Sequence, residues 1–119
     1  MRLATLRRGE GTAAAVQVDA GFTLLDAPDV GTLLATPAGL EEAASAEAKG
    51  DVHVVTEDAE FAALITHSVK VICCGLNYSD HILEMGRELP EFPTLFAKYA
   101  DTLCGAHDAI RSDLSQKVD

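Results

Sequence analysis

The run Val69–Leu76 constrains the fold of this chain more than any other feature of its sequence. Apart from Lys70, the run is apolar on both of its alternating faces. A strand of this kind is typical of a sheet that is covered on both sides. We therefore expect the strand to need packing partners on each face. The chain has 119 residues, which suits one domain, or a small domain and the beginning of another.

The first 26 residues contain three short apolar runs that are divided by turns rich in Gly and Asp. The runs are Leu3–Leu6, Ala13–Val18 and Phe22–Leu25. Short strands separated by such turns are typical of consecutive antiparallel pairing. The sequence therefore predicts a β-meander at the N-terminus.

Three helices are expected between the meander and the buried strand. Asp29 is placed to cap a short helix over Val30–Leu34. Ala38–Lys49 is rich in Ala and Glu, and Gly50 follows at the expected stop. The apolar face of this second helix is nearly all alanine, so we expect it to pack weakly near the surface. A third helix is predicted over Asp58–Thr66 from the spacing of its apolar residues.

A strand, a helix and a second strand are expected from residue 69 onward. Ser79 or Asp80 can cap a helix that runs to about Met85 or Arg87. Gly86 loosens this helix, and Pro90 ends it. Phe92–Ala97 is predicted to form the second strand, and Arg111–Asp119 has no apolar run that could close a fold. The predicted class is α+β. Residues 1–68 form a small β-rich N-terminal domain, and residues 69–119 form the start of a larger, incomplete domain.

The composition is that of a soluble globular protein, with 48% hydrophobic and 24% charged residues. The formal net charge of −10 disfavours binding to nucleic acid or to an anionic membrane surface, although a local Arg/Lys pocket could still hold an anionic substrate. The three cysteines form no spaced framework, which indicates a reducing compartment. No signal peptide or membrane span is evident, so a cytoplasmic location is expected.

His81 and Glu84 are the candidate catalytic residues. They lie three positions apart on the predicted helix, so their side chains share one face. A carboxylate beside an imidazole raises its basicity and holds its orientation, as a general base acting on water requires. By spacing alone, the same pair is more often a solvated surface contact. Arg87, a further three residues on, offers Glu84 a structural ion pair instead.

The segment around this pair resembles the fumarylacetoacetate hydrolase superfamily. The family pattern is a strand ending in Gly-x-Asn-Tyr, then Asp-His-x-x-Glu-Met, then an extended Leu-Phe-x-Lys. The matching positions here are Gly75, Asn77, Tyr78, Asp80, His81, Glu84, Met85, Leu95, Phe96 and Lys98. The resemblance covers residues 69–119 closely and the residues before Val69 only loosely. It implies that residues 69–119 begin a mixed β-roll of the family type.

The resemblance also assigns roles to individual residues. His81 and Glu84 match the acid–base pair that activates water against a substrate carbonyl. Lys98 matches a lysine that can face the substrate, and Arg87 could bind a substrate carboxylate. The family uses Mg²⁺ or Mn²⁺ to hold the substrate oxygens and to stabilise the enolate that leaves. The implied form is a cytoplasmic homodimer that acts on a small oxo-acid.

The metal site is where the sequence departs from the family pattern. The family ligands are a Glu-x-Glu pair after a Val-Asp-x segment, with a later Asp, and Gln116–Asp119 lies about where that segment begins. No metal ligand is therefore assigned to this chain. We expect the chain by itself to bind no metal and to be inactive. Because the strand Val69–Leu76 would lack its sheet partners, we expect the isolated chain to be marginally stable, partly unfolded toward its C-terminus, or rescued by self-association.

The predicted function of the intact form is the metal-dependent hydrolysis of a C–C bond in a β-diketo or acylpyruvate-type acid from aromatic or amino-acid breakdown. Related chemistries, the isomerisation or decarboxylation of oxo-acids, remain open because a family does not fix a reaction. The alternative from another class is a truncated, non-catalytic fragment that acts only by association. A Cys–His hydrolase using Cys74 and His81 is a minor alternative, and Cys73 and Cys74 are expected to be core residues.

Overall fold

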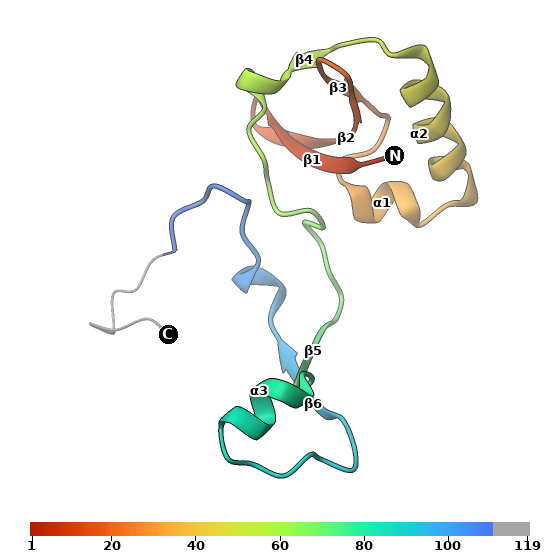
Figure 1. Ribbon diagram of the computed structural model, residues 1–119. Helices are drawn as coiled ribbons and strands as arrows, with labels where there is room; N and C mark the ends of the chain where they lie inside the picture. Colours follow the sequence, from red (N-terminus) through yellow and green to blue (C-terminus); the bar gives the residue numbers. More distant parts are fainter. Residues whose placement is uncertain (111–119) are drawn as a thin grey trace. The chain divides into compact units, whose positions relative to one another are not determined.

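The computed structural model describes residues 1–110, which form two compact units. The first unit contains Met1–Thr66 together with residues 104–110, and the second contains His67–Leu103. The expectation for Arg111–Asp119 lies outside the described residues. The elements of the first unit are β1 (Leu3–Arg8), β2 (Gly11–Val18), β3 (Gly21–Leu24), α1 (Val30–Leu34), α2 (Pro37–Lys49), β4 (Val54–Val55) and the 3₁₀ turn η1 (Thr56–Asp58) (Figure 1). Those of the second are β5 (Val71–Gly75), α3 (Ser79–Glu84), β6 (Thr94–Lys98) and η2 (Ala100–Thr102).

The first unit is built on an antiparallel sheet in the order β1-β2-β3-β4. Arg8 pairs with Gly11, so a two-residue turn joins β1 to β2, and its first residue, Gly9, has a φ of 55°. Glycine adopts this left-handed conformation without steric cost, which favours a tight hairpin. The predicted β-meander is confirmed.

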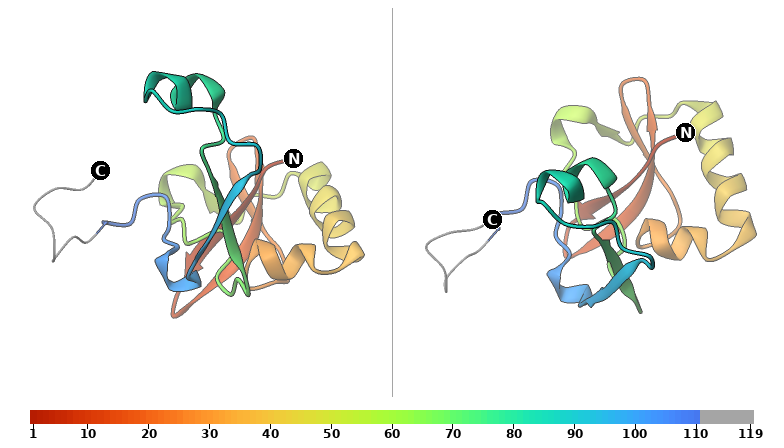
Figure 2. Two further views of the ribbon diagram at one scale, coloured as in Figure 1. Left: turned by 90° about the horizontal axis from the view of Figure 1, so that it is seen from below. Right: turned by 60° about the horizontal axis from the view of Figure 1, so that its bottom comes forward.

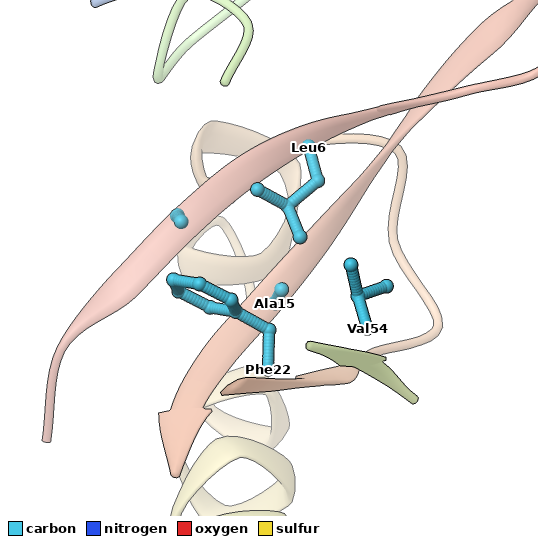
Figure 3. Close-up of a cluster of buried hydrophobic side chains, with 5 residues drawn as sticks. Leu6, Ala15, Phe22 and Val54 are labelled. Atoms are coloured by element: carbon cyan, nitrogen blue, oxygen red, sulfur yellow. The ribbon is translucent and has the colours of Figure 1, made fainter. Parts of the chain in front are cut away.

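This sheet has a cluster of buried side chains on each face. Alternate residues of a strand point to opposite sides, so neighbouring residues of β2 belong to different clusters. One cluster consists of Ala4, Leu6, Ala15, Phe22 and Val54, most of which are labelled in Figure 3. The other consists of Ala14, Val16, Leu25, Leu33 and Ala43, and it joins the sheet to α1 and α2. Leu, Val, Phe and Ala therefore supply the core of the first unit.

A buried carboxylate starts α1. Asp29 is 1% exposed, and one of its oxygens accepts the backbone N–H of Thr32 at 2.6 Å, which is the predicted N-cap. Its other oxygen accepts the backbone N–H of Thr66 at 2.7 Å and also the Thr66 hydroxyl. Burial by itself would raise the pKa of Asp29, but the hydrogen bonds from Thr66 and Thr32 outweigh it and hold the pKa well below its usual value.

The second predicted helix is also confirmed. α2 begins at Pro37 and ends at Lys49, and its C-cap residue Gly50 has a left-handed φ of 71°. It buries Gly39 and Ala43 alone, as its alanine-rich face led us to expect. A Cβ at Gly39 would lie 1.9 Å from the carbonyl oxygen of Leu33, so the contact between the two helices requires glycine there.

The helix predicted over Asp58–Thr66 is wrong. After η1 the chain is extended along β1, where the Arg7 N–H donates to the Glu60 carbonyl at 2.8 Å and the Ala62 N–H donates to the Thr5 carbonyl at 2.9 Å. An isolated bridge pairs Leu6 with Phe61. The edge of β1 offers backbone partners that the local helical spacing could not reveal, and tertiary pairing overrides the helical preference.

In the second unit β5 and β6 form an antiparallel pair, and α3 lies in the connection between them (Figure 2). Val71 pairs with Lys98, and Gly75 pairs with Thr94. Separate helices and antiparallel sheets in both units agree with an α+β class. No helix among the described residues is long and apolar enough to cross a membrane.

The described residues do not cover both faces of this strand, which the sequence predicts to need packing partners on each side. β5 is shorter than the run predicted, and its alternate side chains are half-buried and exposed. Ile72 is 64% exposed and Leu95, on the same face of β6, is 62% exposed. β6 is the only strand that pairs with β5 in the described part of the chain, so most of this apolar surface stays in contact with solvent.

Candidate functional site

The candidate site begins at the turn that follows β5. Leu76 has a φ of 50°, and it is the only non-glycine residue with a positive φ in the described chain. A bulky side chain in this region is unusual, because the left-handed conformation costs roughly 1–2 kcal/mol per residue. Strained backbone of this kind often lies at functional sites. Sequence reasoning missed this feature, because leucine carries no signal for a left-handed turn.

α3 then starts without the predicted side-chain cap. Its N-cap residue is Tyr78, which makes no capping hydrogen bond, and Ser79 and Asp80 already lie within the helix. The Ser79 hydroxyl instead donates to a carboxylate oxygen of Asp80 at 3.3 Å. The prediction that Ser79 or Asp80 caps the helix is therefore wrong. Asp80 still places negative charge in the first turn, where the helix dipole favours it.

α3 holds His81 and Glu84 on one face. The His81 Nδ1 lies 4.0 Å from a carboxylate oxygen of Glu84, and the two side chains are 68% and 78% exposed. Ile82 is only 2% exposed and fixes the buried side of the helix. The distance is too long for a hydrogen bond, and the contact is an ion pair only when the imidazole is protonated. A side-chain rotation would bring the two groups into hydrogen-bond reach, since neither is held by burial.

The helix ends at a glycine turn. The Gly86 N–H donates to the Leu83 carbonyl at 2.9 Å, and the Arg87 N–H donates to the Ile82 carbonyl at 3.1 Å. With Gly86 at a φ of 68°, this is a Schellman motif. Gly86 thus ends the helix close to the predicted limit of Met85 or Arg87. In the described residues no ion pair joins Arg87 to Glu84, the structural pairing that the sequence had left open.

The other candidate side chains make no hydrogen bond or ion pair with this pair among the described residues. Lys98 is the last residue of β6, and its Nζ lies 6.0 Å from the centre of the Phe96 ring. No hydrogen bond or ion pair in the described residues links Lys98 or the Arg87 guanidinium to His81. Cys74 is exposed, and its thiol donates to the Gly75 carbonyl at 3.7 Å. The structure thus brings together His81 and Glu84 alone.

A metal would need a cluster of ligating side chains. Among residues 1–110, no group of three or more His, Cys, Asp or Glu side chains is arranged to hold an ion. Hard divalent cations need several oxygen ligands. The described residues therefore do not fit an Mg²⁺ or Mn²⁺ site by themselves.

Comparison with known proteins found no matching family model. The chain is 45% identical over 58 residues to the mitochondrial oxaloacetate tautomerase fahd2 of Xenopus laevis, which is 48% of this chain and 18% of that protein. It is 42% identical over 50 residues to the mitochondrial oxaloacetate tautomerase Fahd2a of Rattus norvegicus, covering 42% of this chain and 16% of that protein.

A bacterial relative gives a longer match. The chain is 31% identical over 83 residues to a putative hydrolase of Burkholderia cenocepacia, which is 70% of this chain and 29% of that protein. The chain thus spans less than a third of the length of each of these relatives. The motif around His81 and Glu84 and these matches together place the chain in the fumarylacetoacetate hydrolase superfamily.

Proposed function

We propose that the chain supplies the acid–base pair of an enzyme that acts on a small oxo-acid, with His81 and Glu84 as its catalytic residues. The observation that carries this proposal is the position of both side chains on one exposed face of α3, 4.0 Å apart. General acid–base groups must reach solvent and substrate, and in unliganded enzymes their hydrogen bonds are often long. Membership of the superfamily supports an enzymatic role.

The first candidate reaction is hydrolysis of a C–C bond in a β-diketo or acylpyruvate-type acid. His81 would take a proton from water while the water oxygen attacks the substrate carbonyl, and Glu84 would hold and stabilise the imidazolium. The C–C bond then breaks, and its electron pair leaves on the enolate of the second fragment. Protonation of that enolate from the imidazolium completes the cycle.

The second candidate is tautomerisation of an oxo-acid, and it is favoured by the similarity to two relatives named oxaloacetate tautomerases. Here the same pair would move a proton between the carbon next to a carbonyl and its oxygen. The two reactions share the proton transfer and differ in whether water attacks. Arg87 and Lys98 are the cations that we propose for the substrate carboxylate.

A divalent metal is a further part of this proposal for the protein that contains the chain. When bound, Mg²⁺ or Mn²⁺ would polarise the substrate oxygens and stabilise enolate charge. Because residues 1–110 do not form such a site alone, none of the steps above is assigned to the metal. We also propose a homodimer in the cytoplasm as the working form.

One assay separates the candidates. The polypeptide that contains this chain is given oxaloacetate, with loss of the enol followed by ultraviolet absorbance, and separately an acylpyruvate, with release of pyruvate measured by a coupled dehydrogenase. We expect one of the two activities, and we expect His81→Ala to lower it by roughly 10²–10⁴-fold. Absence of both activities, or an activity that His81→Ala leaves intact, would contradict the proposed role of the pair.

A further inference from the structure

The chain returns to the first unit after the second unit ends at Leu103. The chain leaves the first unit after Thr66 and rejoins it at Cys104. We call residues 60–66 the outgoing segment and Gly105–Asp108 the returning turn. Both are held by contacts inside the first unit, and these contacts come from a few residues of β1 and the start of α1.

The returning turn is closed on itself. The Asp108 N–H donates to the Gly105 carbonyl at 3.2 Å, and the Gly105 N–H donates to the Asp108 carboxylate at 2.7 Å. Gly105 is buried, although the residues around it are exposed. The turn is therefore anchored at its first residue.

That anchor is a contact between two backbones. A Cβ added to Gly105 would lie 2.2 Å from the carbonyl oxygen of Phe61, in the outgoing segment, and 3.1 Å from its carbonyl carbon. Glycine is required where two backbones approach this closely. Aromatic rings continue the contact: the centre of the His107 ring lies 5.8 Å from that of Phe61, and the Phe61 ring lies 5.7 Å from that of Phe22 in the core.

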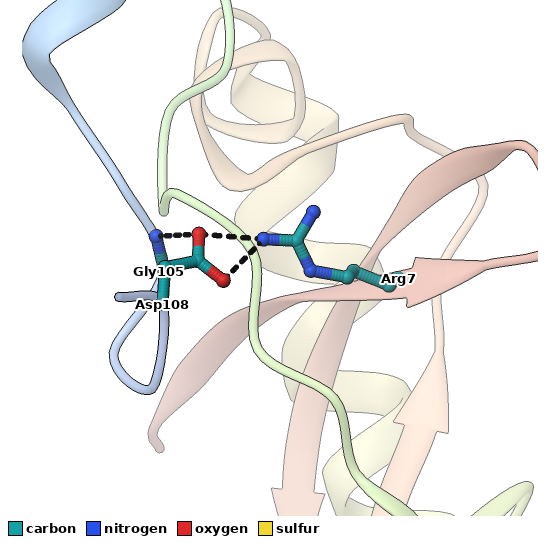
Figure 4. A network of polar contacts seen from close by, with 3 residues as sticks. All are labelled: Arg7, Gly105 and Asp108. Carbon is teal, nitrogen blue, oxygen red and sulfur yellow. Dashed lines mark hydrogen bonds and ion pairs between the residues drawn. The ribbon is translucent and has the colours of Figure 1, made fainter. Parts of the chain in front are cut away.

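Arg7 joins the two segments. Its backbone N–H donates to the Glu60 carbonyl of the outgoing segment at 2.8 Å. Its guanidinium NH2 group lies 2.7 Å and 2.6 Å from the two carboxylate oxygens of Asp108 in the returning turn (Figure 4). The Gly105 N–H and the Arg7 guanidinium together hold the pKa of Asp108 below its usual value. Arg7, in β1, therefore contacts both the outgoing segment and the returning turn.

The outgoing segment is held separately by hydrogen bonds at Thr66. Asp29 accepts both the backbone N–H and the hydroxyl of Thr66, and the Thr5 hydroxyl donates to the Leu64 carbonyl at 2.7 Å. Asp29 and Thr5 are each 1% exposed. Between Thr66 and the returning turn, the segment 67–103 has a single buried side chain, that of Ile82.

We propose that the first unit is a clasp that closes the segment 67–103 at both ends. In this clasp Asp29 fixes the outgoing segment at Thr66, and Arg7 with Gly105 and Asp108 fixes the returning turn. Arg7, Asp29 and Asp108 then hold the two ends of that segment within the first unit. The inference rests on contacts within the first unit and does not require the segment to be catalytic. An exposed ion pair alone would contribute little, so the Gly105 contact is the decisive part.

Hydrogen exchange on the full chain tests the returning turn. We expect Gly105→Ala to raise the exchange rate of the Asp108 amide at least about tenfold, because the turn can no longer dock against Phe61. The Leu25 and Ala14 amides, bonded within the core of the first unit, should keep their rates. Gly11→Ala is the matched control, since the nearest atom to its added Cβ is 4.0 Å away. Equal rates at Asp108 in the wild type and Gly105→Ala would overturn the clasp.

Milder substitutions keep the test sharp if Gly105→Ala fails to fold. Arg7→Gln and Asp108→Asn should each raise the Asp108 exchange rate several-fold, and the double variant should exchange no faster than the faster single one. Additive effects would mean that the two residues act separately, against the proposal. Asp29→Asn should raise exchange at Thr66 and leave Asp108 unchanged. If exchange at Thr66 did not change, the outgoing end would not be held as proposed.

Discussion

The first unit of this chain contains the hydrophobic clusters, and the second contains the candidate acid–base pair. The first has a sheet with a hydrophobic cluster on each face, and no buried side-chain polar atom among the described residues lacks a hydrogen-bond partner. The second buries Ile82 alone and carries both members of the candidate acid–base pair in exposed positions. Burial supplies most of the free energy of folding, whereas acid–base groups must reach solvent and substrate.

This contrast predicts opposite signatures for substitutions in the two units. Changes in the first should lower the free energy of unfolding, and changes at the candidate site should lower turnover while leaving that free energy almost unchanged.

The largest effect is expected at the candidate pair. In the polypeptide that contains this chain, His81→Ala and Glu84→Gln should each lower turnover by roughly 10²–10⁴-fold, the usual range for loss of a general acid or base. Thermal unfolding should stay the same, since both side chains are largely exposed. Metal affinity should change little, because neither residue is proposed as a ligand. Glu88→Gln, an exposed acid outside the pair, is the matched control. A similar loss in that control would remove the special role of the pair.

Core packing gives the next largest effect. Leu6 is 1% exposed, so Leu6→Ala should lower the free energy of unfolding by about 2–5 kcal/mol in urea denaturation. Leu95→Ala removes the same atoms from a side chain that is 62% exposed, and it should cost less than about 1 kcal/mol. If Leu95→Ala cost as much as Leu6→Ala, the second unit would have a core of its own and the contrast would fail.

Acid should weaken the first unit through Asp29. The pKa of this carboxyl is depressed in the folded state, so its stabilisation is complete above the unfolded pKa of about 3.9 and is lost as the pH falls through that value toward the folded pKa. Asp29→Asn offers one acceptor oxygen where the carboxylate uses two, for Thr32 and Thr66. We expect it to cost about 1–3 kcal/mol at pH 7.

Urea midpoints between pH 2 and pH 7 check this prediction. The midpoint of the wild type should fall more steeply below pH 4 than that of Asp29→Asn, so the two curves should converge in acid. Parallel curves would mean that another carboxylate accounts for the acid sensitivity.

The smallest effect is expected at the end of α3. Gly86 has a φ of 68° in the Schellman turn, and a Cβ there would meet no atom within 4 Å. Gly86→Ala should therefore cost only the strain of the left-handed conformation, about 1 kcal/mol. We expect faster amide exchange at Gly86 and Arg87 with no change in β1–β3. A change spread across the first unit would mean that the two units do not respond separately.

The meander and first helices could be predicted because their signals are local. Alternating apolar runs and glycine turns define β1–β3, and Asp29 caps α1 three residues before its Thr32 partner. The extended course of Asp58–Thr66 could not be predicted, because it depends on the free edge of β1 more than fifty residues earlier. The same holds for the pairing of Arg7 with Asp108, which are 101 residues apart.

The candidate site could be predicted in its residues but not in its geometry. The three-residue spacing of His81 and Glu84 put them on one face, as found. Their 4.0 Å separation, the left-handed Leu76 and the uncapped start at Tyr78 depend on how β5 turns into α3. The prediction that β5 needs packing partners on both faces came from its apolar composition alone. Composition does not identify the residues that pack against it.

Amide hydrogen exchange across the whole chain, combined with sedimentation over a range of concentrations, tests the contrast between the units most directly. In the monomer, the amides of β1–β3 should exchange at least about a hundredfold more slowly than those of β5, because global unfolding limits the first and local opening the second. At higher concentration, association should slow exchange in β5 by pairing its exposed apolar surface and open edge. A monomer in which Val71–Gly75 exchanges as slowly as β1–β3 would contradict the account.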